Sequence, residues 1–119
     1  CHRDQDKLME SAKKSKDSEK DEVFSCLGKG FVLFKQKKYE EAFNHIYLLS
    51  MRREYAAQYL LGTFYEYGLG NIHKNINSAY NLYVSAYCNS SDDYLIYLAD
   101  AGISRTIKYI KFNKELESK

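Results

Sequence analysis

The apolar positions of this chain follow the period of an α-helix. In the stretch 56–87, Leu61, Phe64 and Tyr65 fall on one side of a helix, and Gly68 with Gly70 follows them. Glycine enters the left-handed conformation at little cost, so this pair predicts the end of that helix. A second helix is indicated by apolar residues at i, i+3, i+4 and i+7, namely Ala79, Leu82, Tyr83 and Ala86.

Small residues recur in register in two parts of the chain. Gly30 and Gly62 lie 32 residues apart, and Ala42 and Ala79 lie 37 apart. The two intervals differ by five residues because the loop between the two helices is longer in the second pair. We expect both glycines to lie at close helix contacts and both alanines to be buried. Helix pairs of this kind cannot bury their apolar faces alone and must stack on neighbours.

These residues carry a resemblance to a known repeat family. The stretch A-A-Q-Y-L-L-G-T-F-Y-E-Y-G-L-G, followed by a polar loop and A-Y-N-L-Y-V-S-A, resembles the Sel-one-like repeat, the long-loop relative of the tetratricopeptide repeat. The upstream stretch from Gly30 to Ala42 resembles the tetratricopeptide consensus, with Lys37-Lys38 where Gly-Asp is usual. The resemblance implies an all-α fold, a short α-solenoid of antiparallel helix pairs with about two full repeats.

The pattern fades after Tyr87. A polar turn over 88–93 precedes a short helix expected over 94–101, which Gly102 would stop. Ser104 would then cap a last helix with an apolar stripe at Ile103, Ile107 and Ile110, outside which lie Lys108, Lys111 and Lys114. We interpret this part as a degenerate C-terminal pair that caps the solenoid.

The first 22 residues differ in character from the rest. They hold six basic and seven acidic residues and few apolar ones, so 1–22 is expected to be a hydrophilic tether before a helical domain at 23–119. A cysteine, Cys1, stands in front of this tether, as in mature bacterial lipoproteins. The resemblance to lipoproteins implies that Cys1 carries lipid and that the protein lies in the cell envelope. His2, in place of an aspartate after the cysteine, favours the outer membrane. An arbitrary boundary, in a cytoplasmic or secreted protein, is the alternative.

Composition and motifs argue against several functions. The net charge is only +2 and is well mixed, which disfavours nucleic acid as a partner. No nucleotide-binding or hydrolase motif occurs, and the histidines have no partner at metal-ligand spacing, so we expect a non-enzyme without cofactor or metal. Cys26 and Cys88 are expected to be separate buried thiols, because neighbouring repeats place them on different layers.

Binding of a protein or peptide is the function that remains. Stacked helix pairs form a curved wall lined by the first helix of each pair. Counted from the repeat glycines, the residues on this wall are Leu27, Phe31, Phe34, Lys35, Tyr59, Thr63, Glu66 and Tyr67. Local packing is an equally good interpretation of Phe31 and Phe34.

Three hypotheses stay open. The first is a lipid-anchored envelope adaptor that binds its partner through this wall. The second is a fragment of a larger intracellular or secreted repeat scaffold or effector. The third, a small hydrolase, ranks last because no catalytic cluster is present in the sequence.

Overall fold

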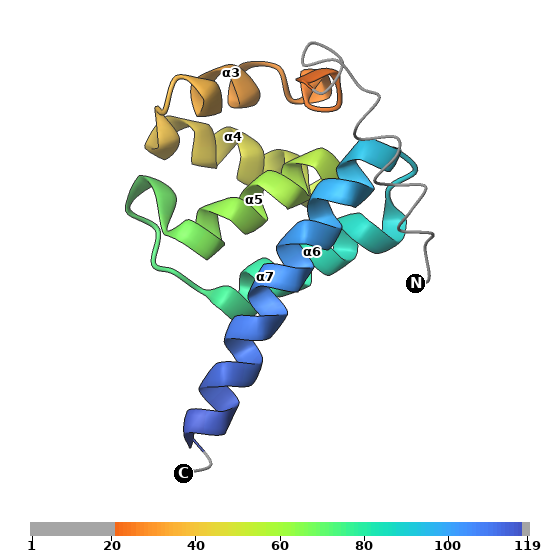
Figure 1. Ribbon diagram of the computed structural model, residues 1–119. Coiled ribbons are helices and arrows are strands. Elements are labelled where there is room, and N and C mark those ends of the chain that lie inside the picture. Colours follow the sequence, from red (N-terminus) through yellow and green to blue (C-terminus); the bar gives the residue numbers. More distant parts are fainter. Residues whose placement is uncertain (1–20, 118–119) are drawn as a thin grey trace.

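The computed structural model describes residues 21–117, and this part of the chain is helical without a strand. Figure 1 shows the path of the chain. The elements, in order, are the short 3-10 turn η1 (Ser25–Leu27), α3 (Lys29–Lys35), α4 (Tyr39–Met51), α5 (Tyr55–Tyr67), the 3-10 turn η2 (Leu69–Asn71), α6 (Ile76–Asn89) and α7 (Asp93–Glu117). The expected all-α class is confirmed.

Consecutive helices pack against one another, so the body is a stack in which sequence neighbours are also neighbours in space. The contacts of α6 with α5 and with α7 are the most extensive, and α7 also touches α5. In Figure 1, α7 passes in front of α6 and continues well beyond the rest of the body. This arrangement is repeat-like and places α5 in the middle of the structure.

The helix boundaries have local causes. Gly68 adopts the left-handed conformation (φ 67°, ψ 41°) and ends α5, as the sequence predicts. The side chain of Asn75 accepts a hydrogen bond from the Ser78 amide at the start of α6. Asp92 accepts one from the Leu95 amide at the start of α7. These caps satisfy amides that the first turn of a helix leaves without partners.

The small residues lie where the sequence analysis placed them. Ala42 and Ala79 are fully buried. A methyl group on Gly30 would come within 3.1 Å of His45 Cβ and 3.4 Å of Ile46 Cγ1. One on Gly62 would lie only 2.7 Å from Cε1 of Tyr83. Both glycines therefore lie at close helix contacts, as expected: Gly30 in the pair α3–α4, which we call the first unit, and Gly62 in the pair α5–α6, which we call the second unit.

The C-terminal part corrects one prediction. Gly102 does not stop a helix at residue 101, because α7 runs without a break through it to Glu117. Gly102 is instead a packing site: a methyl group there would lie 2.7 Å from Cδ2 and Cε2 of Tyr83. The chain uses the missing side chain to bring α7 against α6. The predicted pair of short capping helices is therefore one long helix.

The expected tether lies almost entirely outside the described residues, as does Cys1. Of the range 1–22, only Asp21 and Glu22 are described, and both are exposed.

Candidate protein-binding surface

The predicted binding wall is divided between two helices, and much of it is covered. Phe31 and Lys35 lie on α3, and the other four main candidates lie on α5. Thr63 is buried, and its hydroxyl donates a 2.6 Å hydrogen bond to the Leu60 carbonyl oxygen of its own helix. Thr63 is only 8% exposed and so presents little surface to a partner.

Glu66 is also buried, and it is the centre of a hydrogen-bonded group of three side chains. The Tyr83 hydroxyl donates to Glu66 Oε1 over 2.6 Å. Arg105 donates from Nε to Oε2 (2.9 Å) and from Nη2 to Oε1 (3.1 Å), in the two-pronged geometry that suits a guanidinium and a carboxylate. These bonds join α5, α6 and α7. Glu66 is therefore an internal cross-link of the three helices, with little of its side chain left for a partner.

The charge states of this group follow from its surroundings. Burial opposes ionisation of Glu66, but the hydrogen bonds from Arg105 and Tyr83 outweigh it and hold the pKa of the carboxyl below its ordinary value. Burial, together with the bond to Glu66, raises the pKa of Tyr83. The bond to Glu66 likewise raises the pKa of Arg105. The group is thus a carboxylate that accepts hydrogen bonds from a neutral phenol and from a guanidinium.

Phe31 and Tyr59 belong to a row of aromatic rings that runs from the first unit to the second. Phe31 stacks on Phe24 with ring centroids 4.9 Å apart. The ring centroid of Tyr59 lies 6.1 Å from that of Phe24 and 5.5 Å from that of Tyr83. Both predicted residues are only partly exposed. Phe31 therefore packs locally on Phe24, and Tyr59 continues the row to Tyr83.

The remaining residues of the first unit separate into core and surface. Leu27 is buried, and Phe34 packs edge-on against Phe64, with centroids 5.8 Å apart. Lys35 is exposed; its Nζ lies 2.6 Å from Asp21 Oδ2 and 5.6 Å from the centroid of the Phe31 ring. Only Lys35 among these residues points to solvent.

Tyr67 is the one predicted aromatic residue that is largely exposed, at 52%. It ends α5 directly after Glu66, which binds Arg105, so the end of α5 lies beside α7 at the height of Arg105. Beyond Arg105, α7 carries a set of exposed apolar side chains at i, i+3 and i+7: Tyr109, Phe112 and Leu116. We name Tyr67 and these three residues the α5–α7 corner.

The α7 part of this corner was not predicted from the sequence. The predicted apolar stripe of the last helix consists of Ile103, Ile107 and Ile110, and all three are partly buried in the structure. The spacing of Tyr109, Phe112 and Leu116 was the available signal, because it forms a second apolar stripe on the same helix. Arg105 was missed as well, since nothing local in the sequence connects it to Glu66.

A second group of exposed apolar side chains lies on the first unit. Its members, on α3 and α4, are Val32, Tyr47, Leu48 and Met51. We name this group the α4 face.

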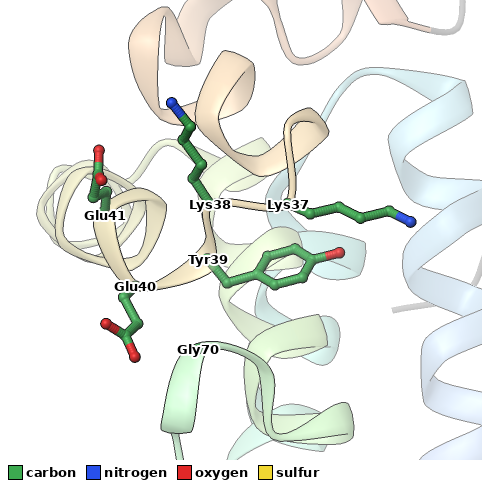
Figure 2. A pocket seen from close by; sticks show the side chains of 6 residues that line it. All are labelled: Lys37, Lys38, Tyr39, Glu40, Glu41 and Gly70. Atoms are coloured by element: carbon green, nitrogen blue, oxygen red, sulfur yellow. The ribbon is translucent and has the colours of Figure 1, made fainter.

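A hollow of about 370 Å³ lies where the loop before α4 meets η2. Figure 2 shows its lining side chains: Lys37 and Lys38 point in different directions, and so do Glu40 and Glu41. Its floor is closed by Gly70, where a methyl group would lie 2.9 Å from the Tyr39 carbonyl carbon. Because its charged groups diverge, this hollow does not assemble a site.

The cysteines differ from their prediction. Cys26 is a free thiol but is exposed, and Cys88 is engaged in a disulfide, so the two are not a pair of separate buried thiols. Partial burial and the nearby Glu54 carboxylate raise the pKa of Cys26. Over residues 21–117, no group of three or more His, Cys, Asp or Glu side chains could hold a metal ion. None of the described helices is long and apolar enough to cross a membrane.

The chain matches no protein-family model, no curated protein and no solved structure. The resemblance to Sel-one-like repeats therefore stays a prediction from the sequence.

Proposed function

We propose that the protein is a non-enzymatic protein-binding module and that the α5–α7 corner is its binding surface. The observation that carries this proposal is the exposure of four large apolar side chains at the end of α5 and along the last turns of α7. This revises the predicted wall: the surface keeps Tyr67 but moves from the middle of α5 to the projecting end of α7.

The composition of the corner suits a protein partner. Tyr67, Tyr109 and Phe112 are aromatic, and aromatic side chains dominate binding energy at protein interfaces. Arg105 lies at the base of the corner with 42% of its side chain exposed, although Glu66 already binds it. A ring of polar and charged groups around an apolar centre is the usual anatomy of an interface.

A photo-crosslinking amino acid placed at residue 109 tests the proposal. In extracts of cells that produce the protein, we expect a discrete crosslinked product from position 109, because this side chain would be covered by the partner. The matched control carries the same group at Tyr47, which is exposed on the α4 face. Products from position 47 alone, or from neither position, would contradict the proposal.

A larger repeat assembly is the second candidate function. The α4 face favours it, because this face and the α5–α7 corner expose apolar side chains at opposite ends of the helix order. A repeat in the interior of an array has a neighbour at each end. Crosslinked products from both position 47 and position 109 would favour this candidate.

Attachment to a membrane through lipid on Cys1 is a separate proposal about a residue outside the described part. A lipid-bearing cysteine is a thioether, and one sulfur cannot also form a disulfide. Peptide mapping without reduction would decide the state of that sulfur and would identify the partner of Cys88. Recovery of Cys1 in a disulfide would rule out the anchor.

A further inference from the structure

The end of α7 is supported on one side only. Ile110, Asn113, Lys114 and Glu117 line a hollow of about 210 Å³ together with Ile76 and Asn77 at the start of α6. The side that faces α5 at Arg105 continues as Tyr109, Phe112 and Leu116, but α5 has already ended at Tyr67. The apolar stripe of α7 therefore has no neighbour along its last two turns within the described residues.

The charged residues beside this stripe change sign along α7. At 100° per residue, Lys108 and Glu115 flank the same edge of the stripe, one before and one after Phe112. Lys111 and Lys114 fall on the far side of the helix by the same geometry. The flanking charges thus run from positive to negative along α7.

This pattern selects one way of pairing with an identical helix. In an antiparallel pair, a two-fold axis at the height of Phe112 places Lys108 opposite Glu115 of the second copy, because the two residues lie almost equally far from the axis. The same axis brings Tyr109 and Leu116 of the two stripes together. A parallel two-fold pair would instead place this edge of the two helices on opposite sides of the contact, so no Lys108–Glu115 pair could form.

We propose that the occupant of the α5–α7 corner is a second copy of this chain, bound through an antiparallel pair of α7 ends. The inference rests on the proposed function, of which it names the partner. The projection of α7 beyond the body leaves room for it, since the two bodies would lie at opposite ends of the paired helices (Figure 1).

The size of the surface predicts a weak dimer. Large aromatic side chains bury about 150–250 Å² each, so four half-exposed apolar residues supply on the order of 400 Å² per copy. With the stems of the flanking charged residues, the total is roughly 1,000 Å², near the lower limit for a specific interface. We therefore expect a dissociation constant in the micromolar range and a concentration-dependent mass.

Sedimentation velocity on the 119-residue chain tests the dimer. We expect the mass to rise from 13.9 kDa toward twice that value as the concentration increases. Phe112→Glu places two like charges on the axis and should raise the dissociation constant at least tenfold. The matched control is Leu48→Glu on the α4 face, which has nearly the same exposure (59% against 58%) and should leave the dimer unchanged.

A charge exchange tests the orientation. Lys108→Glu and Glu115→Lys should each weaken the dimer by about three- to tenfold, because each creates two like-charge contacts across the axis. The double variant restores opposite charges and should return to within about threefold of the parent. Circular dichroism and thermal melts of every variant would confirm that the fold is kept.

Three results would overturn the inference. These are a monomer at all concentrations, dissociation by Leu48→Glu in place of Phe112→Glu, and a double charge variant weaker than either single one. If the protein is a monomer but still crosslinks from position 109 to a different protein, a second copy is not the partner, and the proposed function stands. Loss of all crosslinking from position 109 would count against both.

Discussion

The two helix pairs, α3–α4 and α5–α6, pack different side chains against the glycine of their first helix. Gly30 is followed by Ala42 and Ile46, and Gly62 by Ala79 and Tyr83, so isoleucine and tyrosine occupy matching positions. In the first pair a methyl group on the glycine would still lie 3.4 Å from Ile46 Cγ1, whereas in the second it would overlap the Tyr83 ring at 2.7 Å. The larger ring also reaches a second glycine, Gly102, on α7.

The difference shows how one residue can join three helices. Tyr83 is fully buried between Gly62 and Gly102, and its hydroxyl binds Glu66, which also binds Arg105. Ile46 has no polar end and belongs to the core between α4 and its neighbours. The second unit is thus fixed by shape and by hydrogen bonds together, and the first by apolar packing.

Gly102→Ala should have the largest effect on stability. Its Cβ would lie 2.7 Å from a fully buried ring that Gly62 blocks on the other side, so we expect a loss of about 3 kcal/mol in the free energy of unfolding. Gly30→Ala is the matched control. Its closest neighbour, at 3.1 Å, is the Cβ of exposed His45, and alanine favours a helix by up to about 1 kcal/mol.

Urea unfolding of both variants measures this comparison. Gly30→Ala should lie within about 1 kcal/mol of the parent. Equal losses in the two variants would show that Tyr83 does not distinguish the two units.

Glu66→Gln should have the next largest effect and should change the response to acid. The Glu66 pKa is lower in the folded chain, so the stabilisation from this carboxylate is complete above its unfolded pKa of about 4.3 and is lost as the pH falls through the folded value. At pH 7 the variant loses charged hydrogen bonds, and we expect a cost of about 2 kcal/mol.

Denaturant midpoints from pH 7 to pH 3 check this prediction. The difference between parent and variant should shrink below about pH 4, when the parent carboxyl becomes protonated. A difference that stays constant over this range would mean that Glu66 does not stabilise the fold through its charge.

Lys35→Ala should have the smallest effect. Its ion pair with Asp21 is exposed on both sides, and such pairs contribute less than about 1 kcal/mol. Thermal melts at low and high salt should differ little between parent and variant. If Lys35→Ala lowers the free energy of unfolding as much as Glu66→Gln does, the first unit also contains a stabilising ionic cross-link.

The sequence predicted what depends on local pattern. The helical class, the glycine and alanine register and the end of α5 at Gly68 all follow from spacing and from glycine chemistry. Gly102 was misassigned because a glycine in a helical pattern can either end the helix or admit a neighbour, and the neighbour, Tyr83, comes from another helix.

For a related reason, the sequence could not show which residues of the predicted binding wall are buried. Counting from the repeat glycines places Thr63 and Glu66 on a wall, but not whether another helix covers it. Arg105, which covers Glu66, lies 39 residues further along the chain. Only the path of α7 decides that the middle of α5 is interior and that its end, at Tyr67, is surface.

The continuity of α7 has a mechanical consequence. From Gly102 to Glu117 the helix advances by about 22 Å at 1.5 Å per residue, without a break at which it could bend. The contact of Gly102 with Tyr83 and the bond of Arg105 to Glu66 fix the direction of the helix at the base of this segment. By simple geometry, a tilt of about 5° at Gly102 would displace the far end by about 2 Å. The position of Tyr109, Phe112 and Leu116 therefore depends on contacts at the base of α7, up to 14 residues before them in the chain.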